Sequence, residues 1–334
     1  MNNTAGENGL VIKDGVLIGY TGNEDVKEIM IPDGVTEIAD RALISLLSLS
    51  RIVFPEGLKR IGNESFAHCR ALKSIELPST VQSIGEKAFF DCFLMKKAIM
   101  QDGVEEIGAN AFGQCAFLKE IRLSNLIKAI PEGLFRGCFE LTELIMPREA
   151  TVIGREACSH CYRLSRIEVG DKVERIGENA FHGCSKLETV RLGRAVRSIG
   201  YGAFERCHLL RSIMLSSVLT LDALLLKKHK LYALEGFLTE LADGKAMDEK
   251  LFAAFEELAK AEYKLSKYCS DNVKLGYYLA LRGLLPKEDA QYLTEKTDNV
   301  RIKAVLLEYG KKSSGTVHRE NALDAEAEEV FGEF

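Results

Sequence analysis

The residues of this chain best suited to chemistry are its cysteines and histidines. Nine cysteines occur among 334 residues, and the stretch from Cys158 to Cys161 brings two thiols and the imidazole of His160 close together. Thiolates and imidazoles bind Zn²⁺ well, but a structural zinc site needs four ligands that converge on one point. No second Cys or His pair stands at a matching place, so we expect no metal at this stretch.

Most of the cysteines recur at a constant spacing of 23 residues. This column consists of Cys69, Cys92, Cys115, Cys138, Cys161, Cys184 and Cys207. Cysteine behaves as a small buried hydrophobe when it packs in a core. Side chains stacked in parallel also point past one another, which does not suit a disulfide. We therefore expect free thiols that form one row of the core.

The histidines do not gather into one site. His68 and His160 occupy the same column four copies apart, roughly 19 Å at the usual spacing of adjacent strands. His182 and His208 fall in neighbouring turns. The sequence has no nucleophile elbow, phosphate-binding loop or dinucleotide-binding glycine pattern. It therefore predicts no catalytic residue, no metal ligand and no cofactor.

Three further columns keep the same 23-residue period. The isoleucine column is Ile38, Ile61, Ile84, Ile107, Ile130, Ile153, Ile176 and Ile199. A column of mostly phenylalanine is Leu43, Phe66, Phe89, Phe112, Phe135, Cys158, Phe181 and Phe204. A column of mostly leucine is Leu49, Leu72, Met95, Leu118, Leu141, Leu164, Leu187 and Leu210. One coil cannot bury its apolar face until its neighbours stack on it, so these columns predict a solenoid.

Residues 72–92 show how one coil is built. Ile75 and Leu77 alternate with polar residues, which predicts a strand. A second extended piece precedes Gly85, which lets the chain turn tightly. The stretch 86–92 has the spacing of one short helical turn.

The pattern L-x-x-I-x-L-P-x-x-V-x-x-I-G-x-x-A-F-x-x-C resembles the BspA-like class of leucine-rich repeats over residues 10–216. Residues 14–35 are similar to the N-terminal cap of that family. The resemblance implies an α/β solenoid: a right-handed leucine-rich repeat with a parallel sheet on one side and a protein-binding role. Many members of the family are secreted or surface adhesins, so a bacterial surface adhesin that binds host or matrix proteins is an alternative function.

The exposed side chains of the sheet are the usual contact surface of such a solenoid. We predict partner-binding residues at Glu76, Ile99, Arg122, Ile145, Glu168 and Arg191. A row that mixes apolar and charged side chains suits a protein partner, and Ile99, Arg122 and Ile145 adjoin one another with the arginine as an anchor. Alternatively, β-propensity alone explains the isoleucines at these positions.

The 23-residue phase ends near Ser216, and Ala, Leu, Lys and Glu dominate afterwards. Residues 247–268 have helical spacing, and residues 271–283 resemble residues 298–310. We predict an N-terminal cap (1–25), a solenoid of about eight 23-residue coils (26–216), an all-α block of helical hairpins (217–312) and an acidic tail (313–334). The helical block either caps the open end of the solenoid or forms a second binding module.

Composition and charge bear on the class of partner and on the cellular location. The net charge is −5 and the sequence shows no cluster of Lys and Arg, which argues against nucleic acid as partner. No apolar run approaches the roughly 20 residues that span a bilayer. The N-terminus lacks a signal peptide, which predicts a cytoplasmic location, or the cell surface or secretion if a leader was removed.

These observations favour a protein–protein interaction scaffold without enzyme activity or a small-molecule substrate. An enzyme whose site lies in the helical block is a further alternative, since Tyr263, Lys264, Tyr277 and Tyr278 are there. Tyrosine and lysine on amphipathic helices usually serve packing and solvation, and no acid–base pair converges on them. The sequence does not name the protein partner.

Overall fold

The computed structural model describes residues 4–5, 9–216, 233, 253–254, 280, 285, 287–298 and 300–311. The chain divides into two compact units, of which the first consists mainly of Met1–Arg211 and the second of most of the chain that follows. Within the described residues, no helix is long and apolar enough to cross a membrane. The predicted acidic tail, residues 313–334, lies outside the described residues.

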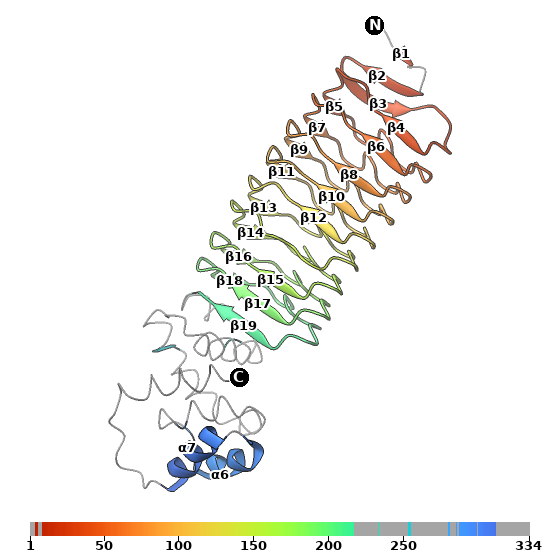
Figure 1. Ribbon diagram of the computed structural model, residues 1–334. Helices are drawn as coiled ribbons and strands as arrows, with labels where there is room; N and C mark the ends of the chain where they lie inside the picture. Colours follow the sequence, from red (N-terminus) through yellow and green to blue (C-terminus); the bar gives the residue numbers. More distant parts are fainter. Residues whose placement is uncertain are drawn as a thin grey trace. The chain divides into compact units, whose positions relative to one another are not determined.

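The first unit is a β-solenoid with two ladders of parallel strands (Figure 1). The first ladder contains β4 (Glu28–Met30), β6 (Arg51–Val53), β8 (Ser74–Glu76), β10 (Lys97–Ile99), β12 (Glu120–Arg122), β15 (Arg166–Glu168) and β17 (Thr189–Leu192). The second contains β5 (Glu37–Ile38), β7 (Arg60–Ile61), β9 (Ser83–Ile84), β11 (Glu106–Ile107), β13 (Ala129–Ile130), β14 (Val152–Ile153), β16 (Arg175–Ile176) and β18 (Ser198–Ile199). Lys97 pairs in register with Ser74 and Glu120, each 23 residues away, which confirms the predicted coil and the parallel sheet.

The N-terminal strands pair in the opposite sense. β1 (Thr4–Ala5), β2 (Leu10–Lys13) and β3 (Val16–Tyr20) form antiparallel pairs. β3 then lies parallel to β5, with Leu17 beside Ile38. The β2–β3 hairpin therefore covers the first edge of the second ladder, where exposed backbone groups would otherwise invite pairing with another chain.

The interior is filled by the predicted columns. Ile84 pairs with Ile61 in the second ladder, and Phe89 stacks on Phe66 with ring centroids 5.1 Å apart. The Phe, Cys and Leu columns are buried throughout the coils. Each coil thus buries its apolar face against the coils above and below it, as the spacing predicts.

The helical turn predicted at residues 86–92 is wrong. Lys87 and Asp91 have φ of 53° and 56°, so the backbone enters the left-handed region twice. In this part of the coil the N–H of Phe66 donates to the carbonyl of Ala88 at 2.8 Å. Only alternate N–H groups bond to the next coil; those between them make turn bonds within the segment, such as Phe90 N–H to the carbonyl of Lys87 at 3.0 Å. A continuous series of bonds from residue i to residue i−4, which a helix requires, is therefore not formed.

The glycine that follows most short strands of the second ladder is required by the close approach of the adjacent coil, in addition to the turn that the sequence predicts there. Gly108 has no left-handed φ, but a Cβ at this position would lie 2.3 Å from the backbone nitrogen of Glu86. The adjacent coil therefore approaches too closely for any larger residue.

Proline interrupts the second ladder between β11 and β13. The N–H of Gly108 donates to the carbonyl of Ile84 at 2.8 Å, and the N–H of Gly154 donates to that of Ile130 at 2.7 Å. Pro131 occupies the equivalent position in the coil between them. Proline has no N–H, so this coil lacks the bond that joins its neighbours to the preceding coil.

The second unit begins with β19 (Ser212–Leu215) and includes α6 (Lys287–Lys296) and α7 (Val300–Lys311). The two helices pack against each other and bury Ala290 and Leu293 of α6 and Ile302 and Leu306 of α7. Helix α7 continues through Gly310, the last residue of the segment 298–310 that resembles residues 271–283.

Other predictions for this region fall on residues that the structure does not describe. They concern most of the helices expected at residues 247–268 and 271–283 and the side chains of Tyr263, Lys264, Tyr277 and Tyr278. The borders proposed at residues 25, 216 and 312 stay predictions.

Candidate functional site

The cysteines belong to the core of the solenoid. The eight cysteines among the described residues are buried and free. The thiol of Cys115 donates to the carbonyl oxygen of Phe89 at 3.2 Å, and the other members of the column make the same bond to the preceding coil. Burial raises the pKa of Cys69 to about 12. The thiolate is the nucleophile and metal ligand, so burial disfavours both roles for Cys69. The buried column is part of the core, as the sequence predicts.

The histidines lie in different groups. His68 Nδ1 lies 2.9 Å from the carboxylate of Asp91, whereas His160 Nδ1 lies 2.8 Å from Ser159 Oγ and its ring contacts that of His182. Desolvation by burial lowers the pKa of His160. In the described part of the chain, no group of three or more His, Cys, Asp or Glu is placed to hold a metal ion.

The six residues predicted to bind a partner follow the first ladder. Strand register places Ile99 between Glu76 and Arg122, and Glu168 beside Arg191. Arg191 Nε lies 3.6 Å from the carboxylate of Glu168.

Ile145 lies in the coil between these two groups and differs from the other five residues in being an apolar side chain that is largely exposed. Its side chain is 72% exposed, the highest value of any large apolar residue in the repeats. Arg122, in the preceding coil, is also exposed and makes no ion pair with a described residue. An apolar side chain and an uncompensated guanidinium thus face solvent from consecutive coils.

The first ladder is interrupted at the coil that carries Ile145. Between neighbouring coils the N–H of Met100 donates to the carbonyl of Arg122 at 2.9 Å. The segment 142–146, in contrast, makes no backbone hydrogen bond to either adjacent coil of the described solenoid. Strands β12 and β15 therefore each turn an unpaired edge toward it.

Side chains hold this segment in place although its backbone is unpaired. Leu144 and Met146 are buried in the core, in the positions that Ile and Leu take in other coils. Because strand side chains alternate between the two faces, the burial of Leu144 and Met146 directs Ile145 outward.

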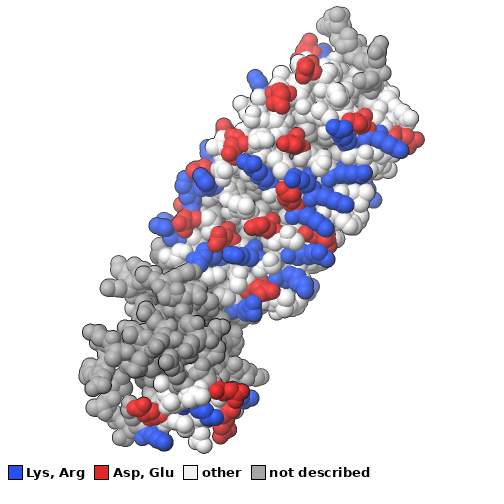
Figure 2. All heavy atoms as spheres, viewed as in Figure 1, with Lys and Arg blue, Asp and Glu red and all other residues white. Residues whose placement is uncertain are grey.

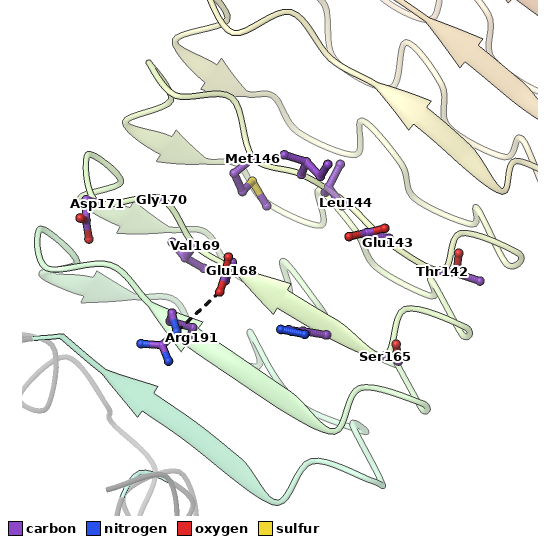
Figure 3. Close-up of a pocket in the computed structure, with 12 residues that line it drawn as sticks. Thr142, Glu143, Leu144, Met146, Ser165, Glu168, Val169, Gly170, Asp171 and Arg191 are labelled. Atoms are coloured by element: carbon purple, nitrogen blue, oxygen red, sulfur yellow. Dashed lines mark ion pairs between the residues drawn. The ribbon is translucent and has the colours of Figure 1, made fainter. Parts of the chain in front are cut away.

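Two hollows flank segment 142–146. The β15 hollow, of about 710 Å³, lies between the segment and β15, and its lining includes Ile145, Glu168 and Arg191. Figure 3 shows Glu143, Leu144 and Met146 on one side of it and the Glu168–Arg191 ion pair on the other. The β12 hollow, of about 670 Å³, lies between the segment and β12, and its lining includes Ile145, Arg122 and Lys119. Ile145 borders both hollows.

Comparison with known proteins identifies the repeats. The family model described as BspA type leucine rich repeat region, with six copies, matches residues 20–119 and 105–231. The chain belongs to the BspA-type leucine-rich repeat family. No curated protein matches the chain significantly.

Several solved structures resemble this BspA-type chain. A leucine-rich repeat protein from Bacteroides ovatus is 31% identical over 58% of this chain and 56% of its own, with a TM-score of 0.48. The leucine rich repeat protein of T. pallidum is 29% identical over 52% and 82%, also with a TM-score of 0.48. A leucine rich cell surface protein from Faecalibacterium prausnitzii is 18% identical over 64% and 92%, with a TM-score of 0.28. The match spans little more than half of the B. ovatus protein.

In this BspA-type solenoid, the site combines an apolar centre, charged neighbours and unpaired backbone groups. Ile145 can enter an apolar pocket of a partner, Arg122 can bind a carboxylate, and segment 142–146 can exchange main-chain hydrogen bonds with an extended strand. The sequence predicts these side chains as a contact surface, which stays a prediction, and it does not predict the hollows. It had no signal for them, since residues 141–147 read L-T-E-L-I-M-P and fit the repeat pattern as well as the paired coils do.

Proposed function

We propose that this chain is a protein-interaction scaffold that binds its partner through the exposed face of the first ladder, centred on Ile145. The observation that carries this proposal is the 72% exposure of Ile145 between two hollows. Exposed apolar side chains that sit among polar residues are typical of interfaces. The proposed partner is a protein, and neither a nucleic acid nor a small-molecule substrate.

The rigid core supports this role energetically. Binding a flexible loop costs about 0.5–1.5 kcal/mol for each rotamer-rich side chain that becomes ordered. Here Ile99, Arg122 and Ile145 project from coils fixed by the stacked columns beneath them, so less order is created on binding. A central apolar residue beside an arginine is also the composition that interface hot spots favour.

Two variants test the assignment of this face. Ile145→Asp places a charge at the proposed centre, and Ile99→Asp combined with Arg122→Glu alters the preceding coils. All three side chains point away from the core, so the variants are expected to keep the thermal unfolding of the wild type. Met30→Asp is the matched control, because Met30 is 62% exposed at the same strand position in the first coil of the ladder.

Partners are captured from the source organism with each variant side by side, identified by mass spectrometry, and then measured with purified protein. We expect affinity for the captured partner to fall roughly a hundredfold for both face variants, as for hot-spot residues that lose about 2–3 kcal/mol. Met30→Asp is expected to bind like the wild type. Equal binding by all variants would show that the partner uses another surface.

The location of the protein decides where its partner comes from. We propose that the partner is a cytoplasmic protein. Immunoblots of cytoplasmic, membrane and surface fractions test this inference. Recovery from intact cells after surface labelling would instead support the adhesin alternative.

A further inference from the structure

A row of lysines runs along the margin of the solenoid where the strands of the first ladder begin. The backbone N–H of Lys96 donates to the carbonyl of Lys73 at 2.8 Å, and that of Lys119 donates to the carbonyl of Lys96 at 3.0 Å. The three residues therefore leave the backbone in consecutive coils, about 4.8 Å apart. All three side chains are exposed.

In several other columns the solenoid compensates charges at this spacing. Equivalent positions of adjacent coils carry opposite charges in the ion pairs Glu28–Arg51, Glu37–Arg60, Glu149–Lys172, Asp171–Arg194 and Glu188–Arg211. Lys73, Lys96 and Lys119 have no ion pair among the described residues. Stacked like charges repel one another, so these three lysines present a row of positive charge without a paired carboxylate among the described residues.

Exposed apolar side chains lie directly beside this row. Phe93 is 42% exposed and Phe117 is 38% exposed, and their rings meet edge to face with centroids 5.2 Å apart. Leu94 is 41% exposed. They precede Lys96 and Lys119 by only two or three residues, so apolar and basic side chains share one surface.

Figure 2 shows Lys and Arg side chains lined up along this margin of the solenoid, with few acidic side chains among them over the coils of β8 to β12. We define the margin surface as Lys73, Phe93, Leu94, Lys96, Phe117 and Lys119. We propose that the margin surface binds an extended acidic peptide segment of a partner protein that carries aromatic or large apolar side chains. The lysine row provides the charge complementarity, and the phenylalanines provide the apolar contact.

The arrangement favours a peptide over a single-stranded nucleic acid. Bases stack on open ring faces, whereas Phe93 and Phe117 pack against each other. A polyanion that continued along the solenoid would also meet Glu120 and Glu140, both in ion pairs with other residues. A peptide can carry acidic residues only in the segment that contacts the three lysines, so it does not have to pass the acidic side chains farther along the solenoid.

The margin surface is separate from the face centred on Ile145, although Lys119 also borders the β12 hollow. The inference does not rest on the proposed function, because it is argued from the lysine row and the exposed phenylalanines and does not use Ile145. One partner can therefore contact both surfaces, or two partners can each use one.

The test uses fluorescence anisotropy of the full chain with a fluorescein-labelled peptide that alternates glutamate with phenylalanine. One variant combines Lys73→Glu, Lys96→Glu and Lys119→Glu, and a second combines Phe93→Ser and Phe117→Ser. We expect each to weaken binding roughly tenfold or more, since exposed charge pairs and aromatic contacts each contribute modestly but act together. Binding by the wild type is also expected to weaken as salt is added.

The matched control combines Lys59→Glu, Lys128→Glu and Arg197→Glu, which changes the same charge on exposed residues outside the margin surface. It is expected to bind the peptide like the wild type, as is Ile145→Asp, which separates this inference from the proposed function. Thermal unfolding by circular dichroism shows that each variant is folded. The inference is overturned if the wild type does not bind the peptide, if both margin variants bind normally, if the control loses as much affinity, or if single-stranded DNA binds more tightly than the peptide.

Discussion

The rings of Phe66 and Phe89 lie parallel, with centroids 5.1 Å apart and planes 4° apart. The next ring, Phe112, continues the stack with a centroid distance of 5.3 Å. These distances follow the rise of the coil, because equivalent backbone atoms in adjacent coils are separated by the spacing of parallel strands. Stacking of identical side chains is therefore the means by which one coil fixes the next.

Removal of one ring from the stack is expected to cost much of the stability of the solenoid. Phe89 is fully buried, so Phe89→Ala should lower the free energy of unfolding by about 3–5 kcal/mol. Phe93→Ala, at an exposed ring in the same coil, should cost less than about 1 kcal/mol. Urea denaturation with comparison of the two midpoints measures the difference, and similar losses for both would contradict the stacked core.

Because the coils approach closely at some glycines and not at others, two Gly→Ala substitutions are expected to differ in their effect on stability. Gly108→Ala places a methyl group 2.3 Å from the backbone nitrogen of Glu86, which cannot move aside as a flexible side chain would. We expect a loss of about 1–3 kcal/mol or more. Gly57→Ala meets nothing within 4 Å and should change stability by about 0.5 kcal/mol or less. A neutral Gly108→Ala in thermal unfolding would mean that the coils separate easily.

The sequence predicts the core of the solenoid well because burial repeats once per coil. Ile84, Phe89 and Cys92 recur at one spacing, and only stacking explains why all must be apolar. The backbone between them was harder to predict. Residues 86–92 have apolar spacing that a helix and a series of turns satisfy equally, and the choice depends on hydrogen bonds to the next coil, such as that from Phe66 to Ala88.

Properties that depend on neighbouring coils were the least predictable. Lys73, Lys96 and Lys119 are far apart in sequence, so the chain shows no basic cluster until folding stacks them. Whether each charge is compensated depends on the residue 23 positions away. The unpaired backbone at Ile145 likewise leaves no trace in a coil whose sequence matches the consensus.

The buried thiols make the stability of the solenoid sensitive to alkaline pH. Burial raises the pKa of Cys69 to about 12, so between its ordinary value and about 12 the unfolded chain loses this proton while the native chain keeps it. The unfolded state then binds fewer protons, and stability falls by about 1.4 kcal/mol per pH unit for this thiol. Below its ordinary pKa the contribution is fully present.

The contribution of Cys69 can be isolated by substitution. In Cys69→Ala the slope of unfolding free energy against pH, measured by urea denaturation between about pH 9 and about pH 11, should be smaller by about 1.4 kcal/mol per unit. Other groups that titrate in this range contribute equally to both proteins and cancel in the difference. Identical slopes would mean that the thiol ionises in the native protein.

The interruption at segment 142–146 predicts uneven hydrogen exchange along the first ladder. Backbone amides that are bonded to the next coil, such as that of Met100, exchange only when the structure opens. The amides of Glu143 and Ile145 have no such bond, so they should exchange orders of magnitude faster than those of Lys97 and Ile99 at the same strand positions. Deuterium uptake followed by mass spectrometry measures this, with residues 97–100 as the internal reference. Equal protection in both segments would mean that the coil pairs with its neighbours in solution, and Ile145 would then lose the two hollows that single it out as the centre of the face.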